Sequence, residues 1–226
     1  MDILKQLRHG LIVSCQAKTG SPLRDSKMMA AMAQAAEQAG AVGIRADGPT
    51  DIEAIRGVVK IPIIGIYKRE LPGTDVYITP TFESAQAVVA AGADLVALDA
   101  TGRLRPGDLT ATELIRRCQT ELGVPVMADI SILPEGIAAA EAGADLVATT
   151  LVGYTPYSHH LSPPNFELIR ELVLAVATPV VVEGHISTPA EARRALDLGA
   201  YAVVVGAAIT QPDQITRRFV DAIQTS

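Results

Sequence analysis

The sequence is poor in the residues that form stacking surfaces and in charge of one sign. It has no tryptophan, only 4% aromatic residues among 226, and a formal net charge of −6 without a basic run. A surface on which nucleic-acid bases stack is therefore not expected. Electrostatic attachment to nucleic acid or to a membrane surface is not predicted either, so an anionic ligand would need local contacts.

Cysteine and long apolar runs are also scarce. Cys15 and Cys118 lie far apart and lack the spacing of a metal or redox motif, so we interpret them as free thiols in a reducing compartment. The apolar run near the N-terminus is too short for a signal peptide, and no later run is long enough to span a bilayer. The sequence predicts a cytoplasmic protein.

What the chain has in abundance is a repeated alternation of apolar runs and helical segments. Hydrophobic residues make up 49% of it, chiefly as aliphatic side chains. A Gly-Ala step leads into four apolar runs, a proline opens three others, and LIVSCQA (11–17) makes the eighth. The four runs after a Gly-Ala step are AGAVGIRAD, AGADLVALD, AGADLVATT and LGAYAVVVG. The three runs opened by a proline are IPIIGIYK, VPVMADIS and TPVVVEGH.

Helix-start signals support this alternation. Residues 188–191 (TPAE) and 110–113 (TATE) both read as capping boxes, and a glycine closes each of four helical segments. Eight strand–helix units in this length predict an α/β fold, a (β/α)8 TIM barrel forming a single domain over residues 1–226. A doubly wound open sheet is the alternative, which eight full repeats disfavour.

Active sites of such barrels lie at the carboxyl ends of the strands, so the polar residues that end the apolar runs are candidates. Asp129 and Glu183 each lie four residues after the proline that opens their run, and Lys68 lies six after its own. Even offsets place these side chains on the same face of their strands. The full set is Gln16, Arg45, Asp47, Lys68, Asp99, Asp129, Thr150, Glu183 and Gly206.

Lys68 and Glu183 would approach a central ligand from different sides of the ring, which suits proton removal and return at carbon. Partial burial lowers the pKa of a lysine and lets it act as a base. The alternatives are a solvated lysine at a strand end and a glutamate that only forms a buried salt bridge.

Two glycine-containing loops predict a phosphate site. Gly184 follows the seventh run, and Gly206, Ala207 and Ala208 follow the eighth, each before a probable helix start. Backbone N–H groups there commonly hold phosphate in barrels, although the glycines could simply turn the chain. Tyr154 either walls the pocket or covers the mouth, and the His159–His160 pair lacks a third metal ligand at a recognisable spacing.

The motifs LIVSCQAKTGSPL, GIRADG, GIYKRE, ALDAT, ADIS, TTLVGYT, VEGHI and VVGAAIT, in this order, resemble the N-acetylmannosamine-6-phosphate 2-epimerase family over essentially the whole chain. GIYKRE and VEGHI are the specific ones. The resemblance implies a cofactor-free and metal-free epimerase of sialic acid catabolism, acting on a phosphorylated amino sugar. It implies Lys68 as the residue that removes and returns the C2 proton of the opened sugar, and Glu183 as its acid/base partner. It implies Gln16, Arg45 and Asp129 as residues that bind the sugar and its N-acetyl group. We add Thr150 and Tyr154 as candidates for substrate binding.

The chain departs from the resemblance at one position. The family commonly has Ile-Thr-Arg-Pro after the last strand, with the arginine reaching the phosphate, whereas this chain has Gln211. Gln211 donates a hydrogen bond but carries no charge. Either phosphate binding is weaker, or another cation such as Arg24 or Lys18 substitutes.

Rival functions are another phosphosugar epimerase or isomerase, and a non-catalytic phosphosugar-binding barrel. Ribulose-phosphate epimerases usually need histidine metal ligands at strand ends, which this chain lacks, and a binder needs no acid and base flanking one carbon. The alanine-rich helix faces leave room for a homodimer.

Overall fold

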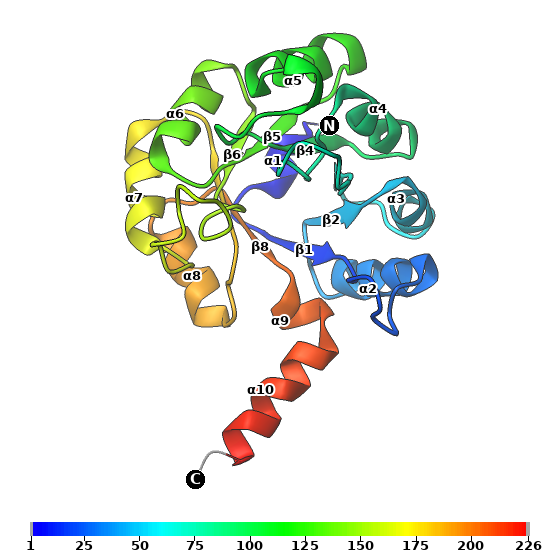
Figure 1. Ribbon diagram of the computed structural model, residues 1–226. Helices are drawn as coiled ribbons and strands as arrows, with labels where there is room; N and C mark the ends of the chain where they lie inside the picture. The colour runs from blue at the N-terminus through cyan, green and yellow to red at the C-terminus, as the bar shows by residue number, and fades with distance from the viewer. Residues whose placement is uncertain (1, 225–226) are drawn as a thin grey trace.

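The computed structural model describes residues 2–224 and shows a closed barrel of eight parallel strands in sequence order (Figure 1). Pairing of Leu11 with Val203 joins the first strand to the last, so the barrel is confirmed and the open sheet is wrong. The strands are β1 (Leu11–Cys15), β2 (Gly43–Asp47), β3 (Ile63–Ile66), β4 (Leu95–Asp99), β5 (Val126–Asp129), β6 (Leu146–Ala148), β7 (Val180–Glu183) and β8 (Ala202–Val205).

Helices surround the barrel, and their starts follow the predicted capping signals. Thr110 and Thr188 each accept a bond from the backbone of a glutamate three residues on, whose side chain reaches back to the threonine N–H. The helices are α1 (Ile3–Leu7), α2 (Ser26–Gln38), α3 (Pro49–Arg56), α4 (Phe82–Ala90), α5 (Ala111–Arg117), α6 (Leu133–Glu141), α7 (Phe166–Ala175), α8 (Pro189–Asp197), α9 (Ala207–Thr210) and α10 (Pro212–Gln224).

The Gly-Ala step of the repeat has a conformational cause. Gly40, Gly92, Gly143 and Gly199 follow α2, α4, α6 and α8, with φ of 96°, 104°, 92° and 99°. These left-handed conformations end a helix and are strained for residues with a Cβ atom. The chain can therefore turn from each of these helices into the next strand within a short connection.

Apolar side chains fill the barrel interior below the strand ends. Ile12, Ile64, Leu95, Met127 and Val181 form one buried cluster there, together with Leu7 from α1 at the amino-terminal end of the barrel. A second layer packs between the strands and the outer helices and includes both cysteines, which are free. Burial raises the pKa of each thiol to about 12, so both stay protonated at neutral pH.

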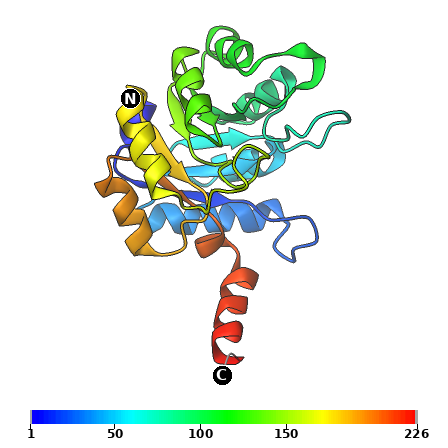
Figure 2. The ribbon, with the colours of Figure 1, turned by 60° about the vertical axis from the view of Figure 1, so that its left-hand side comes forward.

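The last helix departs from the ring. Figures 1 and 2 show α10 projecting away from the barrel, and no residue of it is buried. Its apolar side chains Phe219 and Ile223 are 67% and 82% exposed. Within residues 2–224, no helix has the length and apolar character needed to cross a membrane.

Candidate active site

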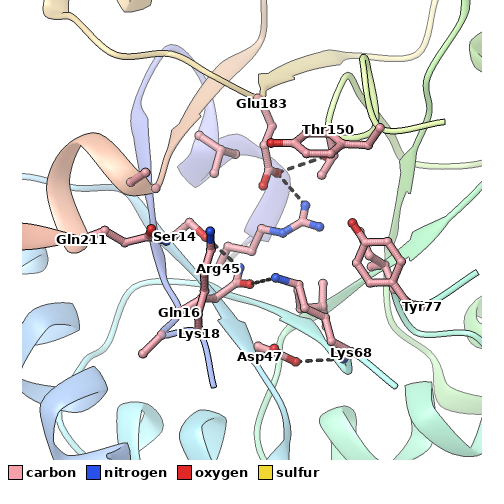
Figure 3. A pocket seen from close by; sticks show the side chains of 18 of the residues that line it. Ser14, Gln16, Lys18, Arg45, Asp47, Lys68, Tyr77, Thr150, Glu183 and Gln211 are labelled. Atoms are coloured by element: carbon pink, nitrogen blue, oxygen red, sulfur yellow. Dashed lines mark hydrogen bonds and ion pairs between the residues drawn. The ribbon is translucent and has the colours of Figure 1, made fainter. Parts of the chain in front are cut away.

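A cavity of about 1080 Å³ opens at the carboxyl ends of the strands. Side chains from β1, β2, β7 and the loops after β3, β6 and β8 line it, and several point into its centre (Figure 3). The apolar layers fill the barrel below, so this mouth is where polar side chains meet a ligand-sized space. The candidate site residues that line it are Gln16, Arg45, Asp47, Lys68, Thr150, Tyr154, Glu183, Gly184, Gly206, Ala207 and Gln211.

A buried guanidinium holds two carboxylates at the floor of the cavity. Arg45 donates from Nη1 and Nη2 to Asp129 at 3.1 and 2.5 Å, and from Nη1 to Glu183 Oε2 at 2.6 Å. Thr150 Oγ1 adds contacts to Asp129 Oδ1 at 2.6 Å and to Glu183 Oε2 at 3.2 Å. Asp129 is fully buried beneath the cavity instead of lining it, so it reaches a ligand only through these neighbours.

Burial and neighbouring charges shift the pKa values of Arg45 and Glu183 for different reasons. Burial alone would lower the pKa of Arg45, but Asp129 and Glu183 outweigh it and raise that pKa above its usual range. Burial raises the pKa of Glu183 to about 7, against the opposing charge of Arg45, and the Asp129 carboxylate acts in the same direction as burial. A carboxyl group with such a pKa can exchange a proton near neutral pH.

Lys68 reaches the centre from the opposite side. Its Nζ donates to Gln16 Oε1 at 2.5 Å, and its backbone N–H donates to Asp47 Oδ1 at 2.8 Å. Although its side chain is accessible from the open cavity, partial burial lowers its pKa and Arg45 adds to the effect, while Asp47 and Glu183 oppose it. A larger fraction of neutral amine follows, which is the form that removes a proton.

A short hairpin after β3 carries Lys68, and its second arm is not among the elements predicted from the sequence. Lys68 pairs with Ile78 in an antiparallel bridge, flanked by bonds from Arg69 N to Tyr77 O and from Thr79 N to Tyr67 O. Tyr77 thereby enters the cavity wall across from Gln211 (Figure 3). The alternating VYIT after the turn residues LPG was the available signal, because such a pattern is typical of a hairpin arm.

The loops after β7 and β8 form the side predicted for phosphate. Gly184, Gly206 and Ala207 line the cavity there, and Ala207 begins α9, where the first N–H groups have no partner within the helix. Ala208 does not line the cavity, because it packs against the cluster between β7, β8 and α8. His185, next to Gly184, stacks on Tyr154 with ring centroids 5.4 Å apart, and this pair walls the mouth.

The remaining rim residues have other tasks. Asp99 is fully buried, binds Arg103 at 2.5 Å and Thr101 at 2.7 Å, and is not part of the cavity lining. His159 and His160 are exposed in their loop. Asp129 and Glu183 both turn toward Arg45, as their equal offsets predict, and Lys68 reaches the same cavity from the hairpin beyond the end of β3. This arrangement can place one base and one acid on different sides of a ligand that has an anionic group at the loops after β7 and β8.

A family model described as "Putative N-acetylmannosamine-6-phosphate epimerase" matches residues 29–225 of this chain. A protein named "Putative N-acetylmannosamine-6-phosphate 2-epimerase" from Caldanaerobacter subterraneus subsp. tengcongensis is 53% identical, covering 99% of this chain and 95% of its own. One of the same name from Thermosynechococcus vestitus is 50% identical, covering 100% and 98%.

Two solved structures resemble this chain, one in sequence and fold and the other in fold alone. The N-acetylmannosamine-6-phosphate 2-epimerase from Clostridium perfringens superposes with a TM-score of 0.95 at 48% identity, covering 98% of this chain and 96% of its own. A thiamine phosphate pyrophosphorylase from Pyrococcus furiosus reaches 0.61 at 18% identity, covering 99% and 100%. The second likeness concerns the barrel fold alone.

Proposed function

Because this chain belongs to the N-acetylmannosamine-6-phosphate 2-epimerase family, we propose that it inverts C2 of N-acetylmannosamine 6-phosphate to give N-acetylglucosamine 6-phosphate. The observation that carries this proposal is the placement of Lys68 and Glu183 on opposite sides of one cavity. Inversion of a carbon beside an aldehyde needs a base at that carbon and a second group that acts as acid and base when the sugar ring opens and closes. A protein that only binds a phosphosugar has no need of such a pair.

We assign the proton transfers as follows. After the sugar ring opens, neutral Lys68 removes the C2 proton, and the electron pair moves onto the C1 oxygen as an enolate. The opened sugar then turns its other face to Lys68, and the protonated amine returns a proton to C2 while the enolate electron pair re-forms the C1 carbonyl, which completes the inversion. Glu183, whose pKa burial raises to about 7, exchanges a proton with the substrate as acid and base at ring opening and closure. Arg45 places its positive charge beside the carboxylates and offsets the negative charge that develops in the enolate.

The other predicted residues orient the substrate. Gln16 touches Lys68 Nζ directly and is placed to bind a sugar hydroxyl or the acetamido group beside the reacting carbon. Thr150 and Tyr154 contribute hydroxyl groups on the side of Glu183, and Asp129 acts through Arg45 and Thr150. The 6-phosphate lies against Gly184, Gly206, Ala207 and Gln211, which sets C2 at the centre of the cavity.

Proton NMR of N-acetylmannosamine 6-phosphate with the purified protein in D₂O tests the reaction, with chelator present and no cofactor added. We expect the glucosamine epimer with deuterium at C2. Conversion without deuterium would mean that the base shields its proton from solvent or that a different bond breaks. Absence of conversion by folded protein would contradict the epimerase and leave phosphosugar binding, measured by calorimetry, as the function.

We further propose that the chain works as a homodimer in the cytoplasm, where two unpaired buried cysteines remain reduced. In the repeat, the helix after each strand packs back on the barrel, but α10, which follows β8 and the short α9, projects away and leaves Phe219, Val220 and Ile223 exposed. A second copy has a barrel of the same repeat to receive this helix, and an exchange between two copies is symmetric and closed.

Light scattering after size exclusion tests the dimer, with Phe219→Glu as the variant and Leu174→Glu, at an exposed apolar position of α7, as the matched control. We expect twice the chain mass for the native protein and the control, and the single chain mass for Phe219→Glu. A monomeric native protein would contradict the proposal.

A further inference from the structure

The phosphate side of the cavity needs positive charge that the surface as a whole does not provide. The net charge of −6 repels an anionic substrate at long range, and Gln211, the polar side chain closest in sequence to α9, carries no charge. Any full positive charge that supplements the backbone N–H groups of these loops must therefore come from a cation within the cavity. The lining contains Lys18, Arg24, Arg45, Lys68 and Arg69.

Three of these cations are engaged elsewhere in the reacting centre or its hairpin. Arg45 is held by Asp129 and Glu183, as described above, and Lys68 is bound to Gln16. Arg69 lies over the ring of Tyr67, with its Cζ atom 5.6 Å from the ring centroid, on the same hairpin as Lys68. None of the three faces the loops after β7 and β8 as a free charge.

Arg24 is also engaged. Its Nη1 donates to the carbonyl oxygen of Ala17 at 3.0 Å and lies 3.9 Å from Asp51 Oδ2. These contacts tie the loop between β1 and α2 to itself and to α3. Its Nη1 is thus committed to the loop, and a phosphate could use only the remaining Nε and Nη2 donors of a guanidinium that already faces the Asp51 carboxylate. Arg24 therefore offers less free charge than an unpaired cation would.

Lys18 differs from the other four. It follows β1, lines the cavity, and also lines a small recess together with Gln211 and Thr210, which places it beside α9. Across residues 2–224, no hydrogen bond or ion pair engages its ammonium group. Figure 3 shows Lys18, Ser14 and Gln211 on one side of the cavity and Tyr77 on the other.

We propose that Lys18 supplies the positive charge that binds the substrate phosphate, a role that position 211 does not fill in this chain. The inference rests on the proposed function, because it takes the 6-phosphate of the sugar as the ligand. An ammonium on a four-carbon stem acts as a mobile point charge, so it can close on the phosphate without the fixed geometry that a guanidinium requires. Gln211 then contributes a neutral hydrogen bond on the same side.

Lys18→Gln tests the assignment, with Lys27→Gln, an exposed lysine at the start of α2, as the matched control. We expect about a tenfold rise in KM for N-acetylmannosamine 6-phosphate, as for the loss of one exposed charge-assisted hydrogen bond, with kcat within about twofold. The control should keep both constants. An unchanged KM in Lys18→Gln would overturn the proposal.

Two further measurements make the role of charge specific. Inorganic phosphate, titrated by calorimetry, should bind Lys18→Gln about tenfold more weakly than it binds native protein or the control. Adding Gln211→Arg to Lys18→Gln should restore phosphate affinity, because it returns a cation to the same side of the cavity. Equal phosphate affinity in native protein and Lys18→Gln would exclude Lys18 as the ligand.

The phosphate titration also separates the two proposals. If the native protein binds phosphate through Lys18 but does not epimerise the sugar phosphate, the proposed reaction fails and the anion site stands. If the native protein turns over the substrate and Lys18→Gln does so with the same KM, the reaction stands and the role of Lys18 fails.

Discussion

The two ends of the barrel use the same kinds of charged residues for different purposes. At the amino-terminal end, Asp94 accepts bonds from Arg56 at 2.8 Å and from the backbone of Ile63 at 2.8 Å. At the carboxyl-terminal end, Arg45 holds Asp129 and Glu183 beside the cavity. An arginine–carboxylate pair thus joins neighbouring repeats at one end and belongs to the proposed reacting centre at the other.

Burial and access to a cavity make the difference. The Asp94 side chain is 30% exposed, and its bonds to Arg56 and the β3 backbone fix the start of that strand. The Glu183 side chain is 13% exposed, faces the cavity, and has its pKa raised to about 7 by burial. Residue type alone therefore does not identify a catalytic carboxylate, because the surroundings of a carboxylate set its protonation state.

The largest expected change in kcat comes from comparing two lysines at opposite ends of the segment that contains β3. Lys68→Ala removes the proposed base, so kcat should fall by roughly 10³–10⁴-fold, the upper part of the range for a positioned acid or base. Lys60→Ala, before β3 at the amino-terminal end, should leave kcat unchanged, since Lys60 is exposed away from the cavity. The NMR assay measures both, and circular dichroism checks folding. Substantial epimerisation by Lys68→Ala would remove it from the catalytic role.

The next comparison pairs one carboxylate from each end. Glu183→Gln should lower kcat by roughly 10²-fold while substrate affinity changes little. Its stability at pH 8 should be kept or raised, because a pKa raised in the folded state means that the ionised carboxylate destabilises the fold above that pKa. Asp94→Ala should keep kcat and lose about 1–2 kcal/mol in the free energy of unfolding, measured by urea denaturation.

The opposite pattern would break the distinction between the two ends. If Glu183→Gln lost stability and kept kcat, Glu183 would be the structural salt-bridge partner that the sequence left open. If its effect were confined to substrate affinity, it would be a binding residue.

Much of the fold was predictable because each repeat carries local signals. The capping boxes at Thr110 and Thr188, and the left-handed glycines such as Gly92, act within a few residues, so the sequence displays them directly. The common orientation of Asp129 and Glu183 followed from strand periodicity, which is also local. The roles of these residues stay predictions that the experiments above test.

Other features depend on contacts between distant segments and could not be predicted in the same way. Burial of Asp129 beneath the cavity depends on its contacts with Arg45 and Thr150. The three residues come from the ends of three different strands. Ala208 was expected to bind phosphate, but the turn of α9 directs it to the cluster near α8. The departure of α10 has no local signal, because its amphipathic pattern is that of a helix packed on a barrel.

The smallest effect tests the proton of Glu183 itself. Thr150 Oγ1 contacts the Glu183 carboxylate at 3.2 Å and lowers its pKa, opposing burial, whereas Thr149 Oγ1 contacts only the Glu183 backbone, at 2.9 and 3.1 Å. Thr150→Val should therefore raise that pKa further and move the limb of the kcat/KM–pH profile that belongs to Glu183 to higher pH. The expected loss in maximal rate is less than about tenfold.

Thr149→Val is the matched control for this shift. It removes a hydroxyl of the same kind one residue away and leaves the backbone N–H of Glu183 without its partner, so the melting temperature should fall while the limb stays in place. If the limb does not move in Thr150→Val, that titration belongs to another group. Lys68 would be the first to examine, because it lies on the other side of the same cavity and burial lowers its pKa.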